Sequence, residues 1–246
     1  AATLAKGRTQ IINAAREPEI VDLGNCLNSM GAKISGLGTD NIIIEGVASL
    51  SSANHRVIAD RIEAGTFAIA AAITQGDLTL VNMDPVYLNA LFAVLEQTGA
   101  TIQIGEESVR VFSSSRAKPV DIATQPYPGF PTDLQAQYMS LMAVADGSSK
   151  ISETIFENRF MHVPELTRMS GDIQIDGRSC IVHGKANLKP APVMATDLRA
   201  SVCLVLAALA TKGKTTISRI YHLDRGYANL EEKLNKCGAK IERKIG

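Results

Sequence analysis

Tryptophan is absent from this 246-residue sequence, and aromatic residues make up only 4% of it. Neither charge is in excess, because 25 lysines and arginines balance 25 aspartates and glutamates. A protein that binds nucleic acid usually carries a basic surface and, for single strands, aromatic side chains on which bases stack. The balanced charge and the shortage of aromatics therefore argue against a nucleic-acid or membrane-surface protein.

Long apolar runs and cysteine motifs are also missing. The longest apolar stretch, residues 202–210, is about nine residues long, whereas roughly 20 are needed to cross a bilayer. No signal peptide is evident near the first residue. The four cysteines, Cys26, Cys180, Cys203 and Cys237, form no CxxC pair, and no histidine lies at metal spacing from them. We expect small buried thiols in a reducing cytosol and no metal site.

What the sequence does contain is a repeat. An apolar, helix-like run ends in glycine four times, at Gly7, Gly76, Gly147 and Gly213, with intervals of 69, 71 and 66 residues. A second mark (MGAKI, TGATI, SGDI or CGAKI) follows each run, and its glycines lie 68, 72 and 67 residues apart. Two landmarks with one period indicate a repeated structural unit of about 70 residues.

Each complete unit predicts the order strand, helix, strand, helix, strand, strand. An acid opens the first helix, at Asp60, Asp133 and Asp197, where it would bind free amides and face the positive end of the helix dipole. These first helices, such as FAIAAAI and CLVLAALA, are apolar around most of their circumference, which predicts burial on nearly all sides. The sequence therefore predicts an α/β protein with helices inside and sheets outside.

Three units are complete, whereas the first opens inside its helix. It lacks the lead-in that ADRIEAG, PTDLQAQ and ATDLRAS supply to the other three, so we expect a chain truncated at its N-terminus. The small, polar stretch at residues 45–54 separates the incomplete unit from the complete ones. We therefore place residues 1–58 in the last, incomplete repeat of a first domain and residues 59–246 in a second domain of three repeats.

Charged residues stand at matching places in these units and suggest a site. Arg159 and Arg225 lie in loops after strands, and Arg199 lies one turn into the third inner helix. Arginine binds phosphate and carboxylate through a two-pronged fork, so the pattern indicates a small polyanionic substrate; helix caps and surface ion pairs explain the arginines equally well. Asp133 fits either an N-cap or a general base. His162, beside a loop, fits a structural histidine.

Six segments resemble one known family: INAAREPEIVDL, RIEAGTF, PGFPTDLQAQ, ETIFENRFMHVPEL, VMATDLRAS and RIYHLDRGY. They are similar to the UDP-N-acetylglucosamine 1-carboxyvinyltransferases, enolpyruvyl transferases that begin peptidoglycan synthesis in the bacterial cytoplasm, and the match runs in register from Ala2 to Arg243. The resemblance implies an inside-out α/β barrel of repeated βαβαββ units, of which this chain is the C-terminal portion. It implies phosphoenolpyruvate and UDP-N-acetylglucosamine as substrates, with no metal and no organic cofactor.

The resemblance also implies roles for single residues. The catalytic residues that it implies are Asp133, Arg159, Asp197, Arg199 and Arg225. Asp133 would contact the sugar 3-hydroxyl and act as its base, Ile155 would contact the nucleotide sugar through its backbone, and Arg225 would lie at the phosphoenolpyruvate site. Fixed positive charge around both anionic groups suits the loss of phosphate from a carboxylated intermediate. Arg243 matches no site motif, and we expect its replacement to matter little for turnover.

Other parts of the family's site would lie outside this chain. The resemblance places an N-terminal lysine and a proton-donating cysteine upstream of Ala1, so the isolated chain is expected to be inactive. Its partner would be the N-terminal part of the same enzyme. A non-catalytic module of the same fold, which binds a nucleotide sugar or a protein, is the alternative. A third possibility is an enolpyruvyl transferase that acts on shikimate 3-phosphate.

Overall fold

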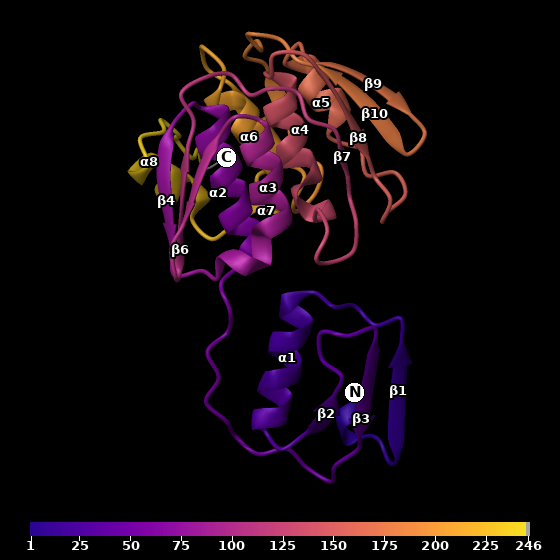
Figure 1. The fold of residues 1–246 in the computed structure, drawn as a ribbon. Coiled ribbons are helices and arrows are strands. Elements are labelled where there is room, and N and C mark those ends of the chain that lie inside the picture. The colour runs from indigo at the N-terminus through magenta and orange to yellow at the C-terminus, as the bar shows by residue number, and fades with distance from the viewer. Residues whose placement is uncertain (245–246) are drawn as a thin grey trace. The chain divides into compact units, whose positions relative to one another are not determined.

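The computed structural model describes residues 1–244, which divide into two compact units (Figure 1). The smaller unit comprises Ala1–Ala59 with Pro126–Gly129, and the larger comprises Asp60–Gln125 and the residues from Phe130 onward. The assignment of residues 1–58 and 59–246 to two domains of a longer protein stays a prediction. No helix within the described residues is both long and apolar enough to cross a membrane.

The smaller unit is a helix beside a three-stranded sheet. Its elements are η1 (Ala2–Leu4), β1 (Arg8–Ile12), α1 (Pro18–Ser29), β2 (Lys33–Ser35) and β3 (Asn41–Glu45). The strands pair antiparallel in the order β1-β3-β2. The helix-like run before Gly7 forms only the short 3-10 helix η1.

The larger unit contains three successive repeats. The first has α2 (Arg61–Ile73), β4 (Asp77–Val81), η2 (Pro85–Leu88), α3 (Asn89–Gln97), β5 (Thr101–Ile104) and β6 (Ser108–Phe112). The second has β7 (Ile122–Ala123), η3 (Thr132–Leu134), α4 (Gln135–Ala143), β8 (Ser148–Ser152), α5 (Val163–Arg168), β9 (Asp172–Asp176) and β10 (Ser179–His183). The third has β11 (Pro192–Met194), α6 (Val202–Leu209), β12 (Thr216–Ser218), α7 (Tyr221–Asp224) and α8 (Leu230–Lys236). Within the described residues, only the second repeat shows the complete predicted order of elements.

The sheets repeat the same topology. In the orders β1-β3-β2, β4-β6-β5 and β7-β8-β10-β9, the last strand of each repeat lies between two earlier ones. Side chains alternate between the two faces of a strand, and β6 accordingly buries Val109 and Val111 while β10 buries Cys180 and Val182. The sequence repeat thus corresponds to a repeated structural unit; in the third repeat the sheet is the parallel pair β11-β12.

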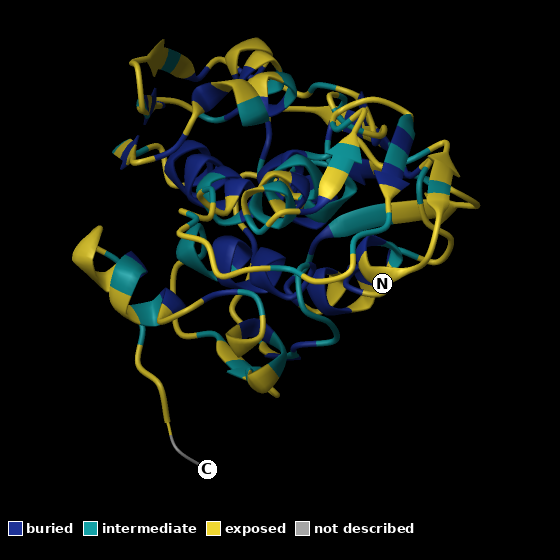
Figure 2. Cartoon of the chain, turned by 90° about the horizontal axis from the view of Figure 1, so that it is seen from below, coloured by how far each residue is buried: buried dark blue, intermediate teal, exposed yellow. Residues whose placement is uncertain are grey.

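The inner helices α2, α4 and α6 contact one another in the middle of the larger unit, with sheets on the outside (Figure 1). Every residue of α4 is buried, and whole helical turns are dark blue in Figure 2. The buried Ser140 hydroxyl of α4 donates to the Cys203 carbonyl of α6 at 2.8 Å. The prediction of helices inside and sheets outside is therefore confirmed.

Gly65 sets how closely α2 approaches the start of the second repeat. A Cβ atom at this position would lie 2.4 Å from Leu134 Cδ1 and 3.1 Å from Leu91 Cδ2. Both leucines are fully buried, so they cannot move aside without opening a gap in a close-packed core. The absence of a side chain at Gly65 therefore allows the inner helices to pack together near their N-terminal ends.

Two local expectations are wrong. Helix α6 begins at Val202, so Arg199 lies in the turn before this helix and not one turn inside it. The turn forms because Asp197 Oδ1 accepts the Ala200 amide at 2.6 Å and competes with a helical path there. The sequence also suggests that the glycine at the end of each inner helix takes the left-handed conformation, but at the end of α2 it is Gln75 that does so, with φ of 54°.

Candidate active site

The larger unit carries every site residue that the resemblance implies. These are Asp133 in η3, Ile155 and Arg159 in the loop after β8, Asp197 and Arg199 in the turn before α6, and Arg225 directly after α7. Asp60 caps α2 by accepting the amides of Ile62 and Glu63, as its position in the sequence predicts. The N-terminal ends of three inner helices therefore hold acids and arginines.

An ion pair holds Asp133. Arg159 Nη2 donates to Asp133 Oδ1 at 2.5 Å, and Arg159 Nη1 donates to Thr132 Oγ1 at 3.1 Å. The Asp133 side chain caps neither η3 nor α4. Of the two interpretations of Asp133, the N-cap is therefore wrong. Within the described residues, Asp133 Oδ2 has no hydrogen-bond donor and is available to one from outside.

Arg199 joins the starts of two inner helices. Its guanidinium donates to Asp60 Oδ2 at 3.2 Å and to the Gly226 carbonyl at 3.1 Å, and it lies 5.4 Å from the centre of the Tyr227 ring. Burial by itself lowers the pKa of Arg199, but the negative charges around it, including Asp60 and Asp133, outweigh burial and raise that pKa. Asp133 and Arg199 are therefore close enough to interact electrostatically.

A buried hydrogen-bond network adjoins Asp133 and Arg199. Tyr227 Oη is 3.0 Å from Thr66 Oγ1 of α2, and Gln137 Nε2 of α4 lies 3.3 Å from Tyr227 Oη. Gln137 Nε2 also donates to the Asp133 carbonyl at 2.8 Å. Burial raises the pKa of Tyr227, against smaller lowering by Thr66 and Arg199, so the phenol keeps its proton. The sequence reasoning missed this network, although polar residues in an otherwise buried helix were a signal for it.

Arg225 differs from the other site arginines because it is exposed and its side chain has no hydrogen bond or ion pair to any described residue. Its neighbour Asp224 is instead held by Arg243, whose Nη2 and Nη1 donate at 2.6 and 3.0 Å. Arg243 also donates to Glu231 at 2.6 Å. Arg225 is therefore free to bind an anion. Arg243 contacts the neighbour of Arg225, and the expectation that Arg243→Ala costs far less turnover than Arg225→Ala stays a prediction.

The backbone amide of Ile155 has a partner, whereas its carbonyl oxygen has no hydrogen-bond donor among the described residues, and its role in binding stays a prediction. The Ile155 amide donates to Glu153 Oε1 at 2.9 Å, and no described group donates to its carbonyl. Glu153 was missed from the sequence, where it is one acid at the end of a predicted strand. Asp197 is engaged by the Ala200 amide, so its observed contact stabilises a turn, and its role at the site stays a prediction.

His162 is a buried structural histidine, in agreement with the sequence analysis. Its Nε2 lies 3.2 Å from Met139 Sδ, and its Nδ1 has no partner in the described structure. Burial, with the charge of Arg159 second, lowers the pKa of His162 to about 3. The folded protein therefore excludes a proton that the unfolded chain takes up below about pH 6.5.

This pKa predicts a pH-dependent stability. As the pH falls from about 6.5 towards 3, only the unfolded state binds the His162 proton, so the free energy of unfolding should fall by about 1.4 kcal/mol per pH unit from this group. Urea unfolding of the larger unit, followed by circular dichroism, should show that His162→Leu removes this part of the slope. Equal slopes for both proteins would contradict the assignment.

The cysteines form no site within the described residues. Cys180 and Cys203 are buried, and burial raises the pKa of the Cys180 thiol to about 12. Cys26 is half-buried, and Cys237 is exposed, so the expectation of burial is wrong for Cys237. No group of three or more histidine, cysteine, aspartate or glutamate side chains among residues 1–244 could hold a metal ion.

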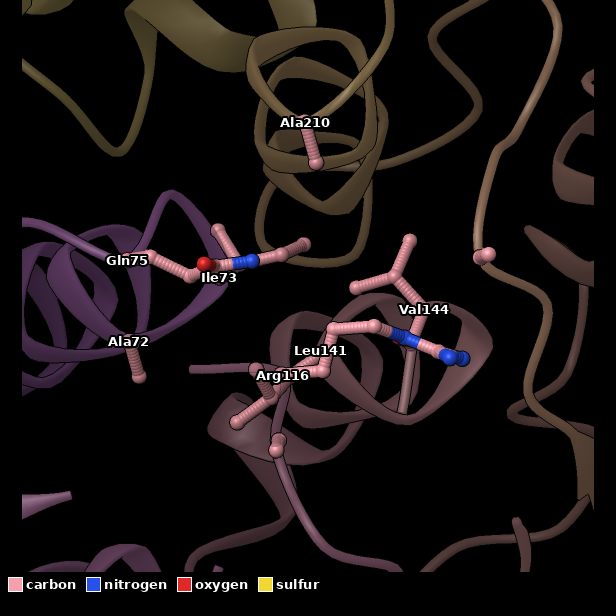
Figure 3. Close-up of a pocket in the computed structure, with 9 residues that line it drawn as sticks. Ala72, Ile73, Gln75, Arg116, Leu141, Val144 and Ala210 are labelled. Atoms are coloured by element: carbon pink, nitrogen blue, oxygen red, sulfur yellow. The ribbon is translucent and has the colours of Figure 1, made fainter. Parts of the chain in front are cut away.

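A small hollow lies at the opposite ends of the same inner helices (Figure 3). Ala72 and Ile73 of α2, Leu141 and Val144 at the end of α4, and Ala210 after α6 line it. Val144 is 11 residues beyond Asp133, a separation of roughly 17 Å along a helix. Arg116 at its edge already donates to the Val144 and Ala145 carbonyls. The hollow is therefore separate from the acids and arginines of the candidate site.

Solved structures define the class of protein. The enolpyruvyl transferase NikO from Streptomyces tendae matches with a TM-score of 0.83 and 29% sequence identity, covering 98% of this chain and 58% of that one. An EPSP synthase from Acinetobacter baumannii matches with a TM-score of 0.74 over 100% of this chain and 60% of that one, and its 21% identity shows the shared fold alone. The chain has the inside-out α/β fold of enolpyruvyl transferases, as predicted.

The family follows from the sequence. Residues 1–234 match the model of the EPSP synthase (3-phosphoshikimate 1-carboxyvinyltransferase) family, and the chain belongs to this family. A UDP-N-acetylglucosamine 1-carboxyvinyltransferase from Afipia carboxidovorans is 58% identical over the whole chain, and one from Gluconacetobacter diazotrophicus is 56% identical over 99% of it. The resemblance seen in the loops is thus confirmed. The chain spans 58% of the length of each of these two relatives.

Proposed function

We propose that this chain is the C-terminal portion of an enolpyruvyl transferase that moves enolpyruvate from phosphoenolpyruvate to the 3-hydroxyl of UDP-N-acetylglucosamine. The observation that carries the proposal is the cluster of Asp133, Arg159 and Arg199 at the N-terminal ends of inner helices. The high identity with relatives of that name supports the choice of acceptor. The reaction would be the first committed step of peptidoglycan synthesis in a bacterial cytoplasm.

The chemistry is an addition followed by an elimination. The sugar 3-hydroxyl attacks C2 of phosphoenolpyruvate, its proton goes to a base, and the methylene carbon gains a proton. The tetrahedral intermediate then loses that proton and expels phosphate, which leaves the enol ether. Both steps involve carboxylate and phosphate groups in one place, so they need fixed cations that do not reorganise during the reaction.

Asp133 suits the role of the base. Arg159 holds Asp133 Oδ1, while Oδ2 has no donor in the described structure. A general base must come within hydrogen-bond reach of the proton that it removes, and Oδ2 is the oxygen that can do so. The ion pair orients the carboxylate, and the Gln137 bond to the Asp133 carbonyl fixes the backbone at the same point.

The cations suit the anionic groups. The Arg225 side chain has no partner among the described residues and is therefore assigned to phosphoenolpyruvate, whereas Arg199 is held by Asp60 and Gly226 and supplies fixed charge. Helix N-termini add partial positive charge at the same place. The N-terminal lysine and the proton-donating cysteine that the resemblance implies belong to the N-terminal part of the same enzyme, which is the proposed partner.

Reconstitution tests the proposal. Co-expression of this chain with the N-terminal part of the Afipia carboxidovorans relative gives what we call the assembled protein. We expect it to release phosphate from phosphoenolpyruvate only when UDP-N-acetylglucosamine is present, and each part alone to release none. A correctly assembled pair without turnover would contradict the proposal and would favour the non-catalytic binding module, which no present observation supports.

A further inference from the structure

Glu153 is a charged residue in the interior of the larger unit, immediately after β8. It is only 1% exposed, and both carboxylate oxygens are hydrogen-bonded. Oε1 accepts the Thr124 hydroxyl at 2.9 Å, the Ile155 amide at 2.9 Å and the Phe156 amide at 3.1 Å. Oε2 accepts the Thr132 hydroxyl at 2.9 Å. A buried carboxylate with four donors is strongly held, because removing any donor would leave charge without compensation.

The Thr132 hydroxyl links Glu153 to the candidate base. A hydroxyl has one proton to donate and two lone pairs that accept. Because Thr132 gives its proton to Glu153, the lone pairs of the same oxygen accept Arg159 Nη1 at 3.1 Å. Arg159 Nη2 then donates to Asp133 Oδ1 at 2.5 Å. The donors thus point in one direction, from Arg159 through Thr132 to Glu153.

Glu153 also shapes the loop on the other side of the site. Its Oε1 accepts the amides of Ile155 and Phe156, and the Ile155 carbonyl has no donor within the described residues. The Phe156 ring lies 4.8 Å from the guanidinium carbon of Arg159. One carboxylate therefore fixes both the loop that carries Ile155 and the arginine that orients Asp133.

We propose that Glu153 is a positioning residue of the reaction, acting through the Thr132 hydroxyl on Arg159 and Asp133 and through two amides on Ile155. This inference rests on the proposed function. The role requires a carboxylate, because glutamine replaces one of the two acceptor oxygens with a donor NH2 group. That group would meet either the three donors at the Oε1 position or the Thr132 hydroxyl at the Oε2 position. In the second case Thr132 would accept from glutamine and turn its proton towards Arg159, which is itself a donor.

Kinetics of the assembled protein test the role. Glu153→Gln and Thr132→Val should each lower kcat by about 100-fold through misplacement of Asp133. In Thr132→Val, which leaves the Ile155 and Phe156 amides bound to Glu153, KM for UDP-N-acetylglucosamine should change less than about threefold. The double variant should have a kcat no lower than that of Glu153→Gln, because both substitutions remove the same link to Arg159. Thr132→Ser keeps the hydroxyl and should therefore have a kcat close to that of the wild type. Additive losses, or a kcat that stays at the wild-type value, would overturn the inference.

Glu165→Gln is the matched control. Glu165 is a second buried glutamate of the same repeat, and its Oε2 accepts only the Met194 amide as a hydrogen bond, at 2.8 Å. Glutamine can accept the same bond, so this variant should keep wild-type kcat. A loss of kcat in Glu165→Gln as large as in Glu153→Gln would mean that any change to a buried glutamate perturbs the site, and would overturn the inference.

A structural measurement on this chain alone separates the inference from the proposed function. Crystal structures of Glu153→Gln and Thr132→Val should show the Arg159–Asp133 pair broken or displaced by more than 1 Å, and Thr132→Ser should retain it. An intact pair in both variants would overturn the inference without reference to activity. If the wild-type assembled protein showed no turnover while the Arg159–Asp133 pair was broken in the variants, the result would contradict the proposed function and leave the inference about Glu153 standing.

Discussion

Arg225→Ala is expected to lower kcat/KM for phosphoenolpyruvate about 1000-fold in the assembled protein. Arg225 is exposed and has no ion pair in the described structure. No protein carboxylate therefore neutralises its charge, which is available to the substrate. Its removal leaves an anion without compensation in the transition state. Steady-state phosphate release at varied phosphoenolpyruvate concentration measures the effect. The kcat/KM of Arg225→Lys should lie between those of the wild type and Arg225→Ala, because lysine keeps the charge but cannot form two parallel hydrogen bonds.

The control for this prediction is Arg110→Ala. Arg110 is an exposed residue of β6 that pairs with Asp77 of β4 on the outer sheet. An exposed pair of this kind contributes little to stability because solvent screens it, and turnover should change less than twofold. Arg243 is unsuitable as a control because it binds Asp224. Comparable losses in Arg225→Ala and Arg110→Ala would contradict the assignment of Arg225.

Asp133→Asn is expected to lower kcat by about 100- to 10,000-fold, the range for loss of a general base. Asparagine has nearly the same shape and can still accept a bond from Arg159, so the loss reports on proton removal more than on packing. Single-turnover measurements with both substrates should show that the chemical step slows while the substrates still bind.

A matched acid keeps the Asp133 prediction falsifiable. Asp146 pairs with Arg116 at 3.2 Å and is largely exposed beyond the end of α4. Asp146→Asn should therefore leave kcat within about twofold, as expected for surface substitutions. If Asp133→Asn retained most of its activity while its thermal stability matched the wild type, Asp133 would not be the base.

Much of the fold could be predicted because it depends on local signals that recur. Helices such as α2 and α6 are apolar on all sides, and their burial follows from composition alone. The alternation in β6 and β10 gives the buried face directly. The third repeat was harder: its closing strands were expected by analogy with the other repeats, and the described residues after α8 form none.

The site could be predicted only residue by residue. Motifs pointed to Asp133 and Arg159, but their ion pair joins positions 26 residues apart, and no periodicity reports such a contact. Nothing in the sequence indicated Glu153, because its burial and its four hydrogen-bond donors arise only when the chain folds. Arg199 was placed inside a helix because it follows Asp197, the acid expected to open that helix, whereas hydrogen bonds of Asp197 and Ser201 hold a turn there.

Product analysis with competing acceptors tests the central claim most directly. The assembled protein would be given phosphoenolpyruvate with equal concentrations of UDP-N-acetylglucosamine and shikimate 3-phosphate, and the products would be identified by mass spectrometry. The account predicts one product, the enolpyruvyl ether of UDP-N-acetylglucosamine, formed in equal amount to the phosphate released and lost in Asp133→Asn. Enolpyruvyl transfer to shikimate 3-phosphate, or sugar-dependent turnover that survives the loss of both Asp133 and Arg225, would contradict it.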